Sequence, residues 1–137
     1  MLKYLLDTNV ISELARLNPD PQVSERVLAL QNLCAISAPT VEELYFGVGR
    51  LPAGARKQML ERWLGGVLAS YTILPYSDSC ARWLGVERAR LMTTGKTASR
   101  ADGEIASVAV VSGLVLVTRN VSDFQHFEGL TVQNWFL

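Results

Sequence analysis

The sequence predicts one three-layer α/β/α domain, spanning residues 1–137, with a short and mostly parallel central sheet. Short apolar runs alternate with amphipathic helical segments along the chain, a pattern typical of a parallel sheet with helices on both faces. The length suits a single compact domain, and 49% hydrophobic against 19% charged residues provides a sizeable core. The apolar, β-branched run at 114–118 is the kind of strand expected at the centre of such a sheet.

The first third of the chain gives two strands and two helices. Residues 4–6 are apolar and end at a polar turn, after which apolar residues recur at helical spacing through 10–14. A second helix is expected at 22–31, where apolar residues again share one face, and a second strand at 33–37.

The middle of the chain carries two helices and a third strand. Pro39 and Thr40 are helix-start signals for the first helix. The segment 55–70 has the pattern of a long amphipathic helix. A short strand at 71–74 follows and ends at Pro75.

The last third completes the alternation. Ser77 and Asp78 are expected caps for a helix that continues to Met92, and Gly113 is the expected end of the next helix. The remaining expected elements are a helix at 102–112, the strand at 114–118, a loop at 119–124 and a strand at 130–133.

Composition excludes several classes of protein. Lys plus Arg equals Asp plus Glu at 13 each, which argues against a general nucleic-acid coat but allows a local basic rim around an acidic centre. Cys34 and Cys80 lack metal-ligand spacing and are expected to be buried thiols in a reducing compartment. Asp7 interrupts the first apolar run, and the longest one, 105–117, is too short to span a bilayer. We expect a cytoplasmic protein with no membrane segment.

Acidic side chains stand at the ends of several elements. Asp7 closes the first strand, Glu43 lies early in the helix after the second, and Asp123 follows the central strand. These three share one edge, because parallel strands place their carboxyl ends on the same side of a sheet. Asp102 opens the helix before the central strand and joins them if that helix starts at the same edge. Each acid also has an ordinary explanation, as a helix cap, a solvated helix residue or a turn residue.

A cluster of these acids predicts a specific chemistry. Carboxylates held close together raise each other's pKa unless a cation is present. Their hard oxygen atoms suit Mg²⁺ or Mn²⁺, ions that keep waters and bind substrate phosphate. Such a centre activates water for in-line displacement at a phosphodiester. His126 is the only histidine, so no Ser-His-Asp site competes with this interpretation.

Four short motifs that carry these acids occur in order: Leu6–Asn9, Glu43–Gly47, Asp102–Ala106 and Thr118–Phe124. Together they resemble the motifs of PIN-domain ribonucleases, most closely the VapC-type toxins of bacterial toxin–antitoxin pairs, including the FitB-like branch. The resemblance covers essentially the whole chain. It implies a PIN-like fold and a Mg²⁺- or Mn²⁺-dependent endoribonuclease that hydrolyses RNA, leaves a 5′-phosphate, forms homodimers and is held inactive by a cognate antitoxin.

The resemblance also implies roles for individual residues. Metal-ligand roles fall on Asp7, Glu43, Asp102 and Asp123. Within this set, Asp123 would support a second ion or an ordered water. Supporting or substrate-binding roles fall on Thr8, Asn120 and Arg119. Glu104 is an extra acid where the family commonly has small or apolar residues, and its helical position turns it away from Asp102, as that of Glu42 turns it away from Glu43.

Two other functions remain open at this point. One is a doubly wound phosphohydrolase with Asp7 as nucleophile, although Asn9 stands where such enzymes commonly have a second acid. The other is a catalytically silent interaction module. The basic group Arg50, Arg56, Lys57 and Arg62 is likewise either a solvated helix face or a rim for RNA phosphates.

Overall fold

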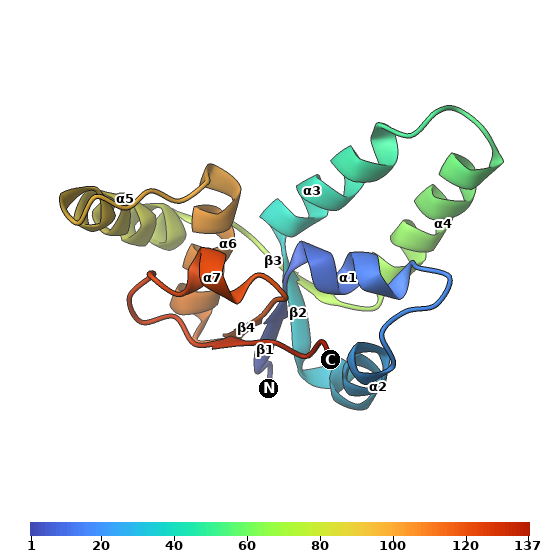
Figure 1. Cartoon of the computed structure of the whole chain (residues 1–137), viewed down its shortest axis with the longest axis horizontal. Coiled ribbons are helices and arrows are strands. Elements are labelled where there is room, and N and C mark those ends of the chain that lie inside the picture. Colours follow the sequence, from blue (N-terminus) through green and yellow to red (C-terminus); the bar gives the residue numbers. More distant parts are fainter.

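The computed structural model describes all 137 residues and has a five-stranded sheet surrounded by helices (Figure 1). The strand order is β3-β2-β1-β4-β5, and every strand pairing is parallel, so the sheet is fully rather than mostly parallel. Leu5 of the central strand pairs with Ala35 on one side and Leu116 on the other. The strands are β1 Tyr4–Leu6, β2 Cys34–Ser37, β3 Thr72–Leu74, β4 Val115–Val117 and β5 Val132–Gln133.

Each of the helices predicted from the sequence is present, and one further short helix, Val121–Phe124, was not predicted. The helices are α1 Thr8–Leu14, α2 Pro21–Leu30, α3 Ala38–Gly49, α4 Ala55–Ala69, α5 Asp78–Thr93, α6 Arg100–Ser112 and α7 Val121–Phe124, with a 3-10 turn η1 at Gln31–Leu33. The loop predicted at 119–124 is wrong in part, because it contains α7. There the Asp123 N–H donates to the Asn120 carbonyl at 3.0 Å and closes one turn.

Helices cover both faces of the sheet. Leu5, Ala35 and Leu116 point to one face, where they pack in a core with residues of α5, α6 and α7. The alternate strand residues Leu6 and Ile36 point to the other face and pack with residues of α1, α2, α3 and α4. The alternation follows from the two-residue period of a strand. The predicted three-layer arrangement is confirmed.

The start and the end of α6 are both set by short-range contacts. Ser99 caps the helix, since its hydroxyl accepts the Asp102 N–H at 3.1 Å, and α6 therefore begins two residues before the predicted start. Gly113 ends it with a left-handed φ of +68°, as predicted, and turns the chain into β4. No helix combines the length and the apolar character needed to cross a membrane.

Candidate active site

Asp7 is a buried carboxylate at the carboxyl end of the central strand. Only 5% of the residue is exposed. Its Oδ1 accepts the Thr8 N–H at 2.8 Å, so it is the cap of α1. Its Oδ2 accepts the Thr118 hydroxyl at 2.8 Å and the Asn9 amide at 3.2 Å. Asp7 is thus both a helix cap and a carboxylate fixed at the edge of the sheet where ligands bind in α/β folds.

Glu43 reaches the same edge from α3. It lies in the second turn of that helix, which Ser37 caps after β2. The Thr8 hydroxyl donates to Glu43 Oε1 at 2.6 Å. This short bond connects the first turn of α1 to α3, and it brings the second acid next to the residue that follows Asp7.

Asp102 and Asp123 complete the group from the other side of β1. Asp102 is half-buried in the first turn of α6, and Asp123 is exposed in α7 after β4. The charge of Asp123 and that of Glu43 both act on Asp102, and the charge of Asp102 acts on Asp7. The structure therefore brings all four predicted acids into one electrostatic centre, including Asp102, whose helix does start at this edge.

Burial and mutual repulsion raise the pKa of two of the acids, Asp7 and Asp102. Burial raises the pKa of Asp7 to about 6, and the charges of Glu43 and Asp102 add to the rise, while the bonds from Thr118 and Thr8 oppose it. Burial is also the main cause of the raised pKa of Asp102. None of the four acids takes part in any ion pair of the chain. The centre is therefore an uncompensated negative site.

The donor set fits a hard divalent cation. All four side chains offer carboxylate oxygens, and no protein cation balances them. No three acid, histidine or cysteine side chains lie close enough together to hold a metal ion between them. An open arrangement is compatible with Mg²⁺, which is usually held by one or two carboxylates and keeps several waters. Asp7, Glu43 and Asp102 are the candidates for binding such an ion, because the charges of Glu43 and Asp102 both act on Asp7.

Thr118 and Asn9 are supporting residues that sequence reasoning did not assign. The Thr118 hydroxyl is fully buried and bonds Asp7, and it accepts the Asn9 amide at 3.1 Å. Asn9 also accepts the Arg119 N–H through its side-chain oxygen at 3.1 Å. The available signal was a hydroxyl residue that ends the most apolar strand, beside the strand that ends at Asp7.

The predicted supports occupy different places around the centre. Thr8 bonds both Asp7 and Glu43, as described above. Asn120 is exposed, and its backbone N–H donates to the Thr118 hydroxyl at 3.0 Å. The Arg119 guanidinium lies over the Phe136 ring, 4.9 Å from its centroid.

Of the basic group on α3 and α4, one member borders the centre. Arg56 lines a cavity of about 230 Å³ whose walls include Thr8 and Glu43. Lys57 instead donates to the Gly49 carbonyl at 3.0 Å, and Arg50 lies over the Phe46 ring at 4.9 Å.

The two acids that were predicted to face away from the centre, Glu104 and Glu42, do so. Glu104 pairs with Arg100 at 3.0 Å, and Glu42 is exposed.

The fold and the acidic centre together define a PIN-type domain. The PIN domain family matches residues 4–130 of this chain, and the chain belongs to that family. It is similar to the VapC ribonuclease Y4jK of Sinorhizobium fredii, with 38% identity over 125 residues that cover 88% of this chain and 89% of the relative. It is 40% identical over 128 residues to toxin FitB of Neisseria gonorrhoeae, again covering 88% and 89%. The resemblance seen in the motifs is confirmed.

The shape of the whole chain agrees with this assignment. The solved structure of FitAB bound to an IR36 DNA fragment superposes with a TM-score of 0.90 and 33% sequence identity. The alignment covers 98% of this chain and 96% of that one.

Proposed function

We propose that this chain is a Mg²⁺- or Mn²⁺-dependent endoribonuclease and the toxin component of a toxin–antitoxin pair. The observation that carries the proposal is the uncompensated centre formed by Asp7, Glu43, Asp102 and Asp123. Membership of the PIN-domain family supports it, as do relatives that are named as a ribonuclease and as a toxin.

Some residues of the centre would bind a cation, and the others hold the side chains of those ligands in place. Asp7, Glu43 and Asp102 would bind the ion, and Asp123 would support a second ion or an ordered water. A bound divalent ion supplies the means to activate water and to stabilise charge on a phosphodiester. Thr118 and Asn9 fix the Asp7 carboxylate, and Thr8 fixes Glu43, so two ligands are oriented before any ion binds.

The alternatives receive less support from the same contacts. A phosphohydrolase with Asp7 as nucleophile commonly has a second acid two residues further along the chain. Asn9 stands there instead, and its amide donates to Asp7 Oδ2 at 3.2 Å. A silent interaction module does not explain why four acids gather without a cation, which is unfavourable unless the site has a use for one.

Cleavage of single-stranded RNA tests the proposal. We expect cleavage with Mg²⁺ or Mn²⁺ and none in excess chelator. The matched pair Glu43→Gln and Glu42→Gln removes one acid from neighbouring positions of α3, and only Glu43→Gln should abolish cleavage, because Glu42 is exposed and makes no contact with the centre. Cleavage that persists in chelator would refute the metal mechanism, and equal loss in both variants would refute the role of Glu43.

We propose two partners besides RNA: a cognate antitoxin and a second copy of this chain. The similarity to FitB and the fit to FitAB support the first. Large apolar side chains left exposed on one chain, such as Leu28, Phe46 and Val86, support the second. Sedimentation at micromolar concentration without antitoxin should give a dimer, and a purely monomeric species would contradict this part of the proposal.

A further inference from the structure

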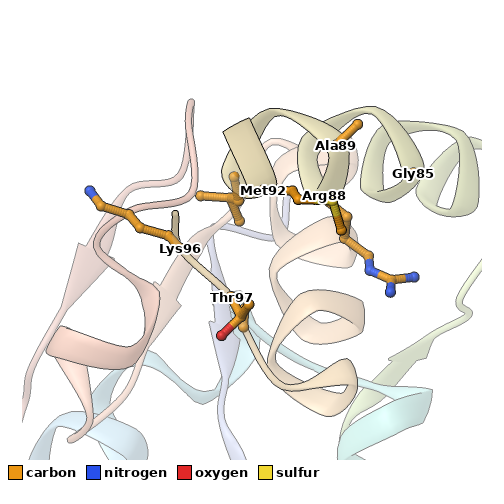
Figure 2. Close-up of a pocket in the computed structure, with 8 residues that line it drawn as sticks. Gly85, Arg88, Ala89, Met92, Lys96 and Thr97 are labelled. Carbon is orange, nitrogen blue, oxygen red and sulfur yellow. The ribbon is translucent and has the colours of Figure 1, made fainter. Parts of the chain in front are cut away.

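A hollow that is bordered by two basic residues lies outside the acidic centre. It has a volume of about 360 Å³ and is formed by the second half of α5 and the loop that leads into α6. We call it the α5–α6 pocket and define it by Arg88, Ala89, Met92, Lys96, Thr97 and Ala98. Figure 2 shows the Arg88 guanidinium and the Lys96 ammonium on either side of Thr97.

The α5–α6 pocket is positively charged in a chain whose net charge is zero. No carboxylate lines it, and neither Arg88 nor Lys96 takes part in an ion pair. The other cations of the same segments are neutralised, since Arg82 pairs with Asp78, Arg90 with Glu87 and Glu128, and Arg100 with Glu104. The two free cations of this region therefore border the same hollow.

The position of the pocket connects it to the acidic centre. The loop that forms its wall runs directly into the first turn of α6, which carries Asp102 (Figure 1). Lys96 precedes Asp102 by six residues, so even a fully extended chain would separate their Cα atoms by no more than about 20 Å. A single strand of RNA lying across the acids can reach this pocket within a few nucleotides.

We propose that the α5–α6 pocket binds two neighbouring backbone phosphates of the RNA substrate, a few nucleotides from the bond that is cleaved. The proposal rests on the ribonuclease function proposed above. The charged ends of Arg88 and Lys96 lie on opposite sides of Thr97, so each can meet a different phosphate, and the Thr97 hydroxyl between them can contact a ribose (Figure 2). No aromatic side chain lines the pocket, so bases cannot stack there. The pocket therefore contributes affinity for RNA without a preference for sequence.

A pair of double variants tests this site. Arg88→Gln with Lys96→Gln removes both charges, while Lys3→Gln with Arg26→Gln removes two exposed, unpaired cations near the N-terminus and on α2, far from the start of α6 (Figure 1). Binding of a single-stranded oligouridylate is measured by fluorescence anisotropy over a range of salt concentrations. Chelator is present throughout, so that no cleavage occurs.

Counterion release sets the expected size of the effect. Loss of two phosphate contacts on single-stranded RNA should lower the slope of log affinity against log salt by about 1.4, and affinity should fall by about tenfold or more near 0.1 M salt. The control variant should keep the slope of the wild type. Unchanged melting temperatures show that both variants are folded, as expected because all four positions are exposed.

Three outcomes would overturn the site. The first is a slope in the pocket variant equal to that of the control, and the second is no measurable binding of RNA by the wild type. The third is unchanged RNA binding together with weaker binding of an acidic peptide, which would assign the pocket to a protein partner. The proposed function fails separately, if the wild type does not cleave RNA with Mg²⁺ or Mn²⁺, because the binding assay requires no metal.

Discussion

Replacing Asp7 by Asn should change the pH dependence of stability in the metal-free protein. Burial, with the charges of Glu43 and Asp102, raises the pKa of this carboxyl from 3.8 to about 6 in the folded state. Between these two pH values the folded protein therefore binds a proton that the unfolded chain does not. Asp7 contributes stability that is present at low pH and is lost as pH rises through about 6.

The size of the effect follows from the two pKa values. Protonation of Asp7 stabilises the folded state by about 2 kcal/mol at pH 4 and about 1 kcal/mol at pH 5, and by almost nothing above pH 7. Asn carries no charge at any pH. Its amide would face the Asn9 amide, which adds a penalty of about 1 kcal/mol that does not depend on pH. The stability of the wild type minus that of the variant should thus fall by about 1 kcal/mol from pH 5 to pH 7.

Urea unfolding in excess chelator, at pH values between 4 and 7.5, measures this difference directly. In thermal melts it corresponds to a shift of about 5 °C in the difference between the two melting temperatures. Asp78→Asn is the control for the loss of one negative charge, because its side chain is 79% exposed on α5. A stability difference between wild type and Asp7→Asn that is the same at pH 5 and pH 7 would refute the link between burial and the raised pKa. Added Mn²⁺ at pH 7 should stabilise the wild type more than the variant.

Three further substitutions separate chemistry from architecture. Thr118→Val removes a hydrogen bond that lowers the pKa of Asp7, so metal binding should need a higher pH. Calorimetric titration with metal at several pH values measures this, and an unchanged pH profile would show that the bond is unimportant. Asp102→Asn should keep the fold, since Ser99 caps α6, but reduce cleavage by orders of magnitude; wild-type cleavage would reduce Asp102 to a helix residue. Glu87→Gln removes the charge of a buried carboxylate that accepts hydrogen bonds from Arg90 on α5 and from the Glu128 N–H after α7. It should lower the free energy of unfolding in urea by about 1–3 kcal/mol without loss of cleavage at 25 °C. Because the pKa of Glu87 is lowered, its contribution is lost as pH falls, and a variant as stable as wild type at pH 7 would contradict the role.

The layers of the fold, and the edge on which the acids gather, follow from local patterns in the sequence. The apolar periods at 4–6 and 114–118 predict central strands, and these strands lie at Tyr4–Leu6 and Val115–Val117. Gly113 predicts a helix end because left-handed backbone favours glycine, and α6 ends there. These features depend on neighbours within a few residues, or on the rule that parallel strands end on one side, so local patterns suffice.

The hydrogen bonds that support the acidic centre depend on long-range packing and could not be predicted from the sequence. The bond from Thr118 to Asp7 joins residues 111 positions apart, and no local pattern specifies which hydroxyl will meet a buried carboxylate. The start of α6 depended on whether Ser99 or Asp102 would cap it, and both are good caps by sequence. The raised pKa of Asp7 needs burial by both layers, and the α5–α6 pocket needs two segments packed side by side. Burial, and contacts between side chains far apart in the sequence, arise only when the chain packs. The spacing of apolar residues along the sequence therefore does not predict them.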